Sequence, residues 1–359
     1  MIPHSYGTLS RLGLIGKLQA SHFTPKFSVR FISPQGMESE PFYFSETIKH
    51  EGAQTWQVDR VEFDQMCLDH AEAHGVEVRM NAGVEQTIFD GGCAVGVRVR
   101  ANGSEGGYVL NARVVVDASG RAGVIGSQLG LREGIPTLRK ASFWSYYVGG
   151  ARGQGIDAGE TTILLLPEQA WAWYIPLPND IISVGIVASP EHFGSSLSSA
   201  EEIFLRTVAA SEPLSVRLAL AERVAPVRGR PSALAFRHRQ TVGHGWVMVG
   251  DARAFLDPIY SSGVFLALES AEQAAQSIHE ALEANDPSAT RLGVFEPRLN
   301  AGVDVISGLI HAFYDPGFSF RKFLDRHPDQ RTALIDCLVG DVFKDMSSFT
   351  SALETMTGS

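Results

Sequence analysis

Apolar residues recur at helical spacing in several parts of the chain. Residues 59–75 are a clear case, with Asp59 at the N-cap position and Glu62 three residues later, as in a capping box. The apolar stripe of this segment consists of Phe63, Met66, Cys67 and Ala71. Leucines at roughly helical spacing predict another helix over residues 6–20. We therefore expect two amphipathic helices near the N-terminus.

Other segments alternate between apolar and polar residues, which is typical of strands. Residues 26–33 and 76–80 show this alternation. Residues 113–120 read as a buried strand that ends in a loop of small residues. Gly91-Gly92 and Asn102-Gly103 are turn signals, and they predict a hairpin-like region between the strands.

The pattern changes over residues 140–245, where alternating stretches at 161–166 and 181–187 predict an antiparallel sheet. One helix is expected within this region, at about residues 199–211. Beyond it, the pattern predicts long helices over 264–284 and 290–315, and then a helix and a Ser/Thr-rich tail over 330–359. An α/β unit, a β-rich insertion and a return to the α/β unit are therefore expected.

Composition narrows the classes of partner. The chain has 359 residues and a formal net charge of −10, which argues against nucleic acid and anionic membranes as partners. Cys67, Cys93 and Cys337 have neither a disulfide pattern nor metal-ligand spacing, so we expect a reducing cytoplasm and no metal. No apolar run approaches the length of about 20 residues that a transmembrane helix needs, and Met1–Ser5 does not resemble a signal peptide.

The stretch 250–264 carries the richest chemistry. The strand-like run 245–249 leads into Gly250-Asp251, and a helix-like run follows Gly263. An Asp at a strand end can accept a hydrogen bond from a sugar or ribityl hydroxyl. The small residues around Ser262 expose backbone N–H groups at a helix N-terminus, and such groups favour anions. This pattern is typical of a nucleotide-cofactor loop.

Three further segments hold candidate residues. Trp171 and Trp173 alternate on one strand, so their rings share a face, as core residues of a sheet or as the wall of a site. Lys26 begins an apolar, alternating strand, where it is either a surface lysine or a buried functional one. Arg60 opens the helix at 59–75 and either contacts a ligand or pairs with a nearby acid, and Asp117 ends the strand at 113–120.

Together these motifs resemble the flavin-dependent halogenases, a family with the glutathione-reductase-like FAD-binding fold. Asp257-Pro258-x-x-Ser261-Ser262-Gly263 resembles the family's flavin and halide loop, and Trp171-x-Trp173-x-Ile175-Pro176 resembles its tryptophan signature. The resemblance covers about residues 1–335. It implies an α/β fold with a β-sheet substrate domain and a missing N-terminal segment, since no Gly-x-Gly-x-x-Gly turn occurs before Ile2-Pro3.

The resemblance also implies a division of the chain. Residues 1–139 would form part of the FAD-binding domain, and residues 140–244 the antiparallel substrate region. Residues 245–330 would return to the FAD-binding domain with C-terminal helices, and residues 331–359 would be a C-terminal helix and tail.

Roles for individual residues follow from the same resemblance. Lys26 would deliver the halogen, Ser262 and Gly263 would bind chloride or bromide, and Trp171, Trp173 and Tyr260 would wall the flavin from the substrate. FAD would contact six residues, Arg60, Asp117, Gly250, Asp251, Pro258 and Gly263.

Reduced FAD, O₂ and halide would then halogenate an electron-rich aromatic, and a separate flavin reductase would supply the reduced flavin. Tryptophan-type halogenases have a glutamate where this chain has Tyr260, so the resemblance favours a phenol or a pyrrole, with a carrier-bound substrate as one option. Two alternatives stay open: an FAD-dependent monooxygenase or oxidoreductase of the same fold, and a truncated remnant without catalytic activity.

Overall fold

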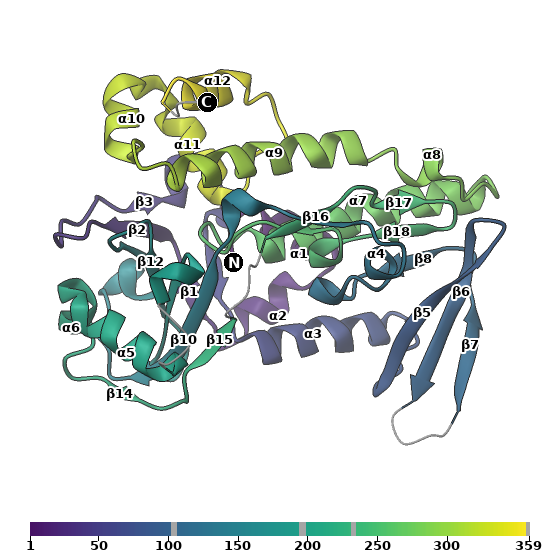
Figure 1. Ribbon diagram of the computed structural model, residues 1–359, viewed down its shortest axis with the longest axis horizontal. Helices are drawn as coiled ribbons and strands as arrows, with labels where there is room; N and C mark the ends of the chain where they lie inside the picture. The colour runs from purple at the N-terminus through teal and green to yellow at the C-terminus, as the bar shows by residue number, and fades with distance from the viewer. Residues whose placement is uncertain (102–105, 194–198, 231–234, 357–359) are drawn as a thin grey trace. The chain divides into compact units, whose positions relative to one another are not determined.

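The computed structural model describes residues 1–101, 106–193, 199–230 and 235–356. The chain divides into two compact units (Figure 1). Unit 1 contains Met1–Met66, Pro136–Leu234 and Gly308–Ser359, and unit 2 contains Cys67–Ile135 and Ala235–Ser307. Each unit is thus built from segments that lie far apart in the sequence.

An eight-stranded sheet dominates unit 1, in the order β14-β10-β13-β12-β11-β2-β3, with β15 paired to β10. Its strands are β2 (Ser28–Ile32), β3 (Phe42–Tyr43), β10 (Ala141–Val148), β11 (Thr161–Leu165), β12 (Trp171–Pro176), β13 (Ile181–Ala188), β14 (Glu222–Arg223) and β15 (Arg228–Arg230). The pairs within 140–245 are antiparallel, as predicted, but β11 runs parallel to β2. A separate two-stranded ribbon joins β1 (Thr24–Lys26) to β4 (Thr55–Gln57).

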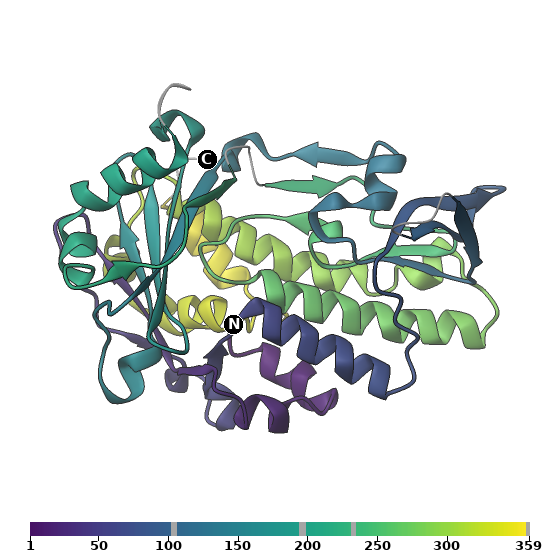
Figure 2. The same cartoon turned by 90° about the horizontal axis from the view of Figure 1, so that it is seen from below.

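Helices cover one face of this sheet with apolar side chains (Figure 2). They are α5 (Ala200–Ala210) and α6 (Glu212–Arg217), where one helix was expected at 199–211. Phe204 and Leu214 are fully buried against the even-numbered residues of β12, Ala172 and Tyr174. Because side chains alternate along a strand, Trp171 and Trp173 project from the opposite face.

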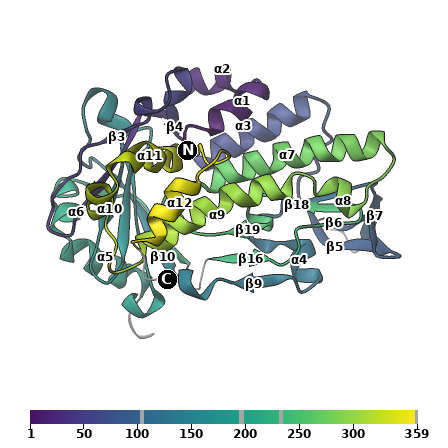
Figure 3. The same cartoon turned by 90° about the horizontal axis from the view of Figure 1, so that it is seen from above.

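The remaining helices of unit 1 come from both ends of the chain. They are α1 (Ser5–Arg11), α2 (Ile15–Gln19), α3 (Arg60–Ala73, which passes into unit 2 after Met66), α10 (Phe320–Arg326), α11 (Arg331–Val339) and α12 (Ser347–Glu354). Figure 3 shows α10, α11 and α12 grouped together. The short 3-10 helices of unit 1 are η1 (Phe44–Glu46), η2 (Glu51–Ala53), η4 (Pro136–Leu138), η5 (Gly155–Gly159), η6 (Pro190–Phe193) and η8 (Pro328–Gln330).

Unit 2 holds three small sheets. They are β5-β6-β7 (Ala82–Asp90, Cys93–Ala101, Gly107–Asn111), β17-β18-β8 (Val242–Gly243, Trp246–Met248, Val115–Asp117) and β19-β16-β9 (Ala254–Phe255, Phe236–His238, Arg132–Gly134). Its helices are α4 (Val124–Gln128), α7 (Gly263–Glu283), α8 (Ala289–Leu292) and the first part of α9 (Glu296–Phe313), with η3 (Gly120–Ala122) and η7 (Gly250–Ala252). Strands β8 and β18 are parallel, and each ends in a 3-10 turn.

Several predicted elements have different boundaries. The helix expected over 6–20 is two helices, because Gly13 between them has a φ of +76°, a value that suits glycine and breaks a helix. The helix expected over 290–315 is likewise split into α8 and α9, with Gly293 after α8. The strand expected over 26–33 divides into β1 and β2. The strand expected over 76–80 is absent, since these described residues join α3 to β5 without pairing.

Other local predictions are confirmed only in part. The side chain of Asp59 accepts hydrogen bonds from the N–H groups of Val61 and Glu62 and so caps α3. Glu62 pairs with His22 rather than closing a capping box, and Phe63 alone of the expected stripe is fully buried. Gly91-Gly92 forms the β5–β6 turn. Asn102-Gly103 lies outside the described residues.

Candidate active site

In unit 2 the candidate cofactor residues stand at the carboxyl ends of two parallel strands. Met248 of β18 pairs with Asp117 of β8, and the turns that follow, η3 and η7, contact each other. Ligands of open α/β sheets bind outside the carboxyl ends of the strands. The fold therefore brings the turn after Asp117 against the turn that contains Gly250 and Asp251.

The carboxylate of Asp117 already has partners within the protein. Its Oδ1 atom accepts hydrogen bonds from the backbone N–H of Ser119 at 3.0 Å and from the Ser119 hydroxyl at 2.5 Å, and its Oδ2 atom accepts one from Ile125 N–H at 2.7 Å. Asp117 is 5% exposed. It therefore ties the strand-end loop to the start of α4, and its contact with FAD stays a prediction.

The loop before α7 has the chemistry of an anion site. The Oδ1 atom of Asp257 accepts from Ile259 N–H at 2.9 Å, which turns that carboxylate toward its own loop. Ser261 has a φ of +55°, and Ser262 makes no side-chain cap at the helix N-terminus. The first turn of α7 contains no acidic residue, and a Cβ atom added to Gly263 would meet nothing within 4 Å.

These features test whether the residues fit the anionic group of a flavin cofactor and a halide. The N–H groups at the start of a 21-residue helix provide a positive end without a competing carboxylate in its first turn. Tyr260 is 6% exposed and Ser262 is 4% exposed, whereas Gly263 at the start of the helix is exposed. At the neighbouring strand end, Gly250 N–H donates to the Ser270 hydroxyl at 2.9 Å and holds η7 against α7. The donor set therefore fits.

In unit 1, Trp171 and Trp173 lie on one face of β12 with ring centroids 6.0 Å apart. The indole N–H of Trp171 donates to the Tyr314 hydroxyl at 2.7 Å, and that of Trp173 donates to Ser183 at 3.0 Å. Trp173 lies across Gly185 of the neighbouring strand, where an added Cβ atom would be only 2.1 Å from the ring. Both indoles are thus held by the protein itself, which suits a wall.

Lys26 is buried, which favours the functional reading over the surface one. It is 3% exposed, and its Nζ atom donates to the Met1 carbonyl at 3.5 Å and lies 5.6 Å from the centroid of the Phe44 ring. Among the described residues, no carboxylate forms an ion pair with it. Burial lowers the pKa of Lys26 from its ordinary 10.5 to about 8.

Arg60 is in a more ordinary setting. Its guanidinium forms two hydrogen bonds of 2.9 Å with the Asp64 carboxylate one turn along α3, and both side chains are more than half exposed. This i,i+4 pair accounts for Arg60 without a cofactor. Its contact with FAD remains a prediction.

Tyr314, at the end of α9, is a residue that sequence reasoning missed. Its hydroxyl accepts the Trp171 indole N–H, and the ammonium of Lys140 stands 3.9 Å from the centroid of its ring. Tyr314 and Lys140 are both buried. No motif or spacing pointed to this pair, because 143 residues separate Tyr314 from Trp171.

The candidate residues thus form two groups. Unit 1 holds Lys26, Arg60, Trp171 and Trp173, and unit 2 holds Asp117, Gly250, Asp251, Pro258, Tyr260, Ser262 and Gly263. Within unit 1, β2, β11 and β12 are adjacent strands, so Phe31, Ile163 and Trp173 lie in one row across the sheet. Lys26 ends β1 in the separate ribbon with β4, two residues before the start of β2.

Within the described ranges, no three His, Cys, Asp or Glu side chains gather in a way that could hold a metal ion. Nor does any helix in this part of the chain have the length and apolarity needed to cross a bilayer.

Comparison with known proteins points in one direction. The tryptophan halogenase family model matches residues 17–318. The chain is 30% identical to a 1H-pyrrole-2-carbonyl-(peptidyl-carrier protein) chlorinase of Pseudomonas fluorescens, over 96% of this chain and 80% of that protein. It is also 30% identical to the corresponding brominase of Pseudoalteromonas luteoviolacea, over 96% of this chain and 83% of that protein.

Solved structures agree with the sequence matches. The flavin-dependent brominase Bmp2 superposes with a TM-score of 0.87 at 26% identity, over 99% of this chain and 88% of that one. The myxobacterial chondrochloren halogenase CndH, an FAD-dependent halogenase, superposes with a TM-score of 0.80 at 27% identity, over 100% of this chain and 87% of that one. The predicted α/β FAD-binding fold of the halogenase type is confirmed. The chain belongs to the tryptophan halogenase family and is a flavin-dependent halogenase.

Proposed function

We propose that this enzyme halogenates a pyrrole ring presented on a carrier protein, with Lys26 as the residue that delivers the halogen. The buried ammonium of Lys26, which forms no ion pair among the described residues and lies on the ribbon that leads into β2, is the observation that carries this proposal. A surface lysine would have solvent or an acid as its partner. Among the described residues, the Lys26 ammonium instead donates to the Met1 carbonyl and lies near the Phe44 ring, with the Met1 amino group as a neighbouring positive charge.

Reduced FAD, when bound, would supply two electrons to O₂, and halide would supply the other two and so be oxidised to hypohalous acid. The residues proposed to hold it are Gly250, Asp251 and Pro258 with the start of α7 at Gly263, and, from the resemblance, Asp117 and Arg60. The backbone N–H groups at Ser262 and Gly263 would hold the halide, because no acid stands in the first turn of α7 to repel it.

Lys26 would transfer halogen from hypohalous acid to the ring by one of two routes. As an ammonium, it donates a hydrogen bond to the acid, and the aromatic C–H then exchanges for a C–X bond with release of water. As a free amine, it first exchanges an N–H for an N–X bond with release of water, and the halogen then moves to the ring while the ring proton returns to the amine. A pKa of about 8 leaves both forms accessible near neutral pH.

The tryptophans would separate the reacting partners. Since both indole N–H groups are already bonded to Tyr314 and Ser183, neither is available to bind substrate, and the rings offer only apolar surface. Tyr260 would add an aromatic surface at the halide loop. Such walls exclude water and keep the organic substrate from the flavin.

Two observations support a carrier-bound pyrrole. The chlorinase and the brominase to which this chain is similar both act on 1H-pyrrole-2-carbonyl attached to a peptidyl-carrier protein. This chain also has Tyr260 in the halide loop, where the resemblance to tryptophan-type enzymes would require a glutamate. A phenol is the alternative ring. A separate flavin reductase is the proposed source of reduced FAD.

The test is product analysis with the full chain, FAD, a flavin reductase, O₂ and a carrier protein loaded with pyrrolyl thioester. With chloride or bromide we expect a product whose mass and isotope pattern show added halogen, and no such product from Lys26→Ala. An oxygenated product that forms without halide would instead identify a monooxygenase. Failure to acquire a flavin absorption spectrum would identify a remnant without catalytic activity.

A further inference from the structure

The chain segment that holds Lys26 contacts three buried residues at the junction of η5 and β11. We call these residues, Gly159, Glu160 and Thr161, the corner. Gly159 packs directly on β1, since a Cβ atom added to it would lie 1.8 Å from the Pro25 carbonyl oxygen and 2.9 Å from the Thr24 methyl group. Only glycine permits this approach. The backbone on the N-terminal side of Lys26 is therefore fixed by direct contact.

Gln57 closes the corner from the partner strand. It lies opposite Thr24 in the β1–β4 ribbon, and its Nε2 atom donates to the Gly159 carbonyl at 3.0 Å and to the Thr161 hydroxyl at 2.7 Å. Gln57 is 4% exposed and Thr161 is 3% exposed. Two buried hydrogen bonds thus connect the ribbon that carries Lys26 to Gly159 and to Thr161, the first residue of β11.

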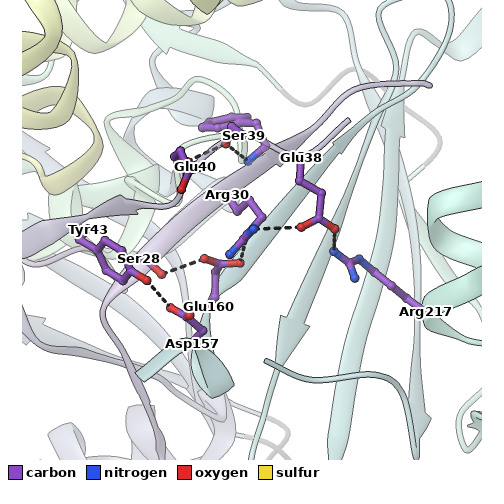
Figure 4. A network of polar contacts seen from close by, with 10 residues as sticks. Ser28, Arg30, Glu38, Ser39, Glu40, Tyr43, Asp157, Glu160 and Arg217 are labelled. Atoms are coloured by element: carbon purple, nitrogen blue, oxygen red, sulfur yellow. Dashed lines mark hydrogen bonds and ion pairs between the residues drawn. The ribbon is translucent and has the colours of Figure 1, made fainter. Parts of the chain in front are cut away.

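Glu160 holds the other side of Lys26. Its carboxylate accepts from the Ser28 hydroxyl at 3.0 Å and from Arg30 Nε at 2.7 Å, as Figure 4 shows. These two residues follow Lys26 by two and four positions. Burial raises the pKa of Glu160, and Arg30 and Ser28 oppose that rise by bonding to the charged form.

The outer part of the same network reaches solvent. Arg30 also donates to Glu38 at 2.9 Å, and Glu38 accepts from Arg217 at 2.7 Å. Tyr43 donates to Asp157 of η5 at 3.0 Å (Figure 4). The corner is therefore tied to β2 and β3 by charged and hydroxyl groups and not by apolar packing alone.

By contrast, the Lys26 head group has little to hold it. Its hydrogen bond to the Met1 carbonyl is long, at 3.5 Å, and the centroid of the Phe44 ring lies 5.6 Å from its Nζ atom. The direction of the side chain must then come from the backbone that carries it, and that backbone is bracketed by the corner on both sides.

We propose that Gln57 and Glu160 are positioning residues, which through the corner at Gly159 aim Lys26 at the ring to be halogenated. This inference rests on the proposed function of Lys26 and goes beyond it. A misaimed lysine would still allow hypohalous acid to form at the flavin, but less of that acid would reach the substrate. Loss of positioning would therefore uncouple the formation of hypohalous acid from halogenation of the substrate. A general loss of structure would lower both together.

The experiment measures how hypohalous acid divides between substrate and solution. The full enzyme turns over carrier-bound pyrrole in the presence of a dissolved hypohalite scavenger, and both halogenated products are quantified. We expect Glu160→Gln and Gln57→Leu to lower the ratio of halogenated substrate to halogenated scavenger by about fivefold or more, since misplacement by about 1 Å can cost a hundredfold in rate. The sum of the two products should stay near that of the wild type.

Further variants serve as controls for this test. Glu191→Gln removes a carboxylate that pairs with Arg139 at 2.8 Å, a bond like that between Glu160 and Arg30 but exposed, and it should leave the ratio unchanged. Glu160→Asp, which retains the charge, should recover part of the ratio. If Gln57→Leu does not fold, Thr161→Val takes its place. This variant removes one of the two acceptors of the Gln57 amide with little change in volume, and it should lower the ratio about two- to threefold.

The outcomes separate the two proposals. If Lys26→Ala still halogenates the carrier-bound ring, the assignment of Lys26 fails and the positioning inference fails with it. If Lys26→Ala is uncoupled but Glu160→Gln, Gln57→Leu and Thr161→Val keep the wild-type ratio, only the positioning inference is overturned. A parallel fall of both products, with the ratio unchanged, would mark a purely structural role for the corner and would also overturn it.

Discussion

Replacing Lys26 with methionine is expected to stabilise the protein at neutral pH. The lysine is 3% exposed and has no carboxylate as an ion-pair partner among the described residues, so its charge is held in a site that disfavours charge. Methionine has a similar length and no charge. The variant should lose halogenation, yet unfold at a higher urea concentration than the wild type at pH 7.

The size and pH dependence of this effect follow from the pKa. Burial lowers the pKa of Lys26 from 10.5 to about 8, and a drop of that size costs about 3 kcal/mol of folding free energy at pH 7. Below pH 8 the lysine is protonated in both states and the full cost applies. Between pH 8 and 10.5 the unfolded chain binds the proton and the native chain does not, so native stability rises with pH. Above 10.5 the cost has gone.

The assay compares urea unfolding of wild type and Lys26→Met at pH 7, 8.5 and 10, followed by tryptophan fluorescence. We expect an advantage of about 3 kcal/mol for the variant at pH 7 that shrinks steadily toward pH 10. Lys322→Met, at an exposed position of α10, serves as control and should shift stability by no more than about 0.5 kcal/mol. A variant that is less stable at pH 7, or an advantage that does not change with pH, would refute the reasoning.

Two further substitutions test the tryptophan wall. Gly185→Ala puts a Cβ atom 2.1 Å from the Trp173 ring, so it should cost about 1–3 kcal/mol, shift tryptophan fluorescence and weaken substrate binding, all by displacing that ring. Gly229→Ala is the matched control, because its Cβ atom would crowd a phenylalanine at 2.4 Å on the helix-covered face of the same sheet. This variant should lose stability without a change in KM. Equal KM values for the two variants would contradict the proposed wall. Tyr314→Phe removes the acceptor of the buried Trp171 N–H and should cost about 1–3 kcal/mol by thermal unfolding, whereas an unchanged midpoint would mean that the hydrogen bond contributes nothing.

The unit 2 part of the site could be read from the sequence because it is local. A strand, a turn of small residues and a helix follow one another within residues 245–283, and each has a distinct pattern of residues. The same holds for the end of β8, where Asp117 stands at the last residue of a buried strand. Local order of this kind survives folding, so motif and structure agree.

The supports of the unit 1 site could not be read in the same way. Tyr314 reaches Trp171 across 143 residues, and Gln57 reaches Thr161 across 104. Such contacts depend on which strands become neighbours, and neither periodicity nor spacing records that choice. The parallel pairing of β11 with β2, which brings the corner at Gly159 against β1, went unpredicted for the same reason.

The role proposed for Lys26 would explain why its supports are polar and do not bond to its own head group. A carboxylate bonded directly to Lys26 would fix the side chain and remove the cost of burying it, but it would also hold the ammonium charged and block the amine. In this protein both oxygens of the Glu160 carboxylate are instead bonded to Ser28 and Arg30. On the proposed roles, the lysine would be positioned through its backbone while its amine stays free to react. The free energy lost by burying Lys26 and the polar contacts at the corner would both follow from one requirement. The lysine must be held in place without a direct partner for its amine.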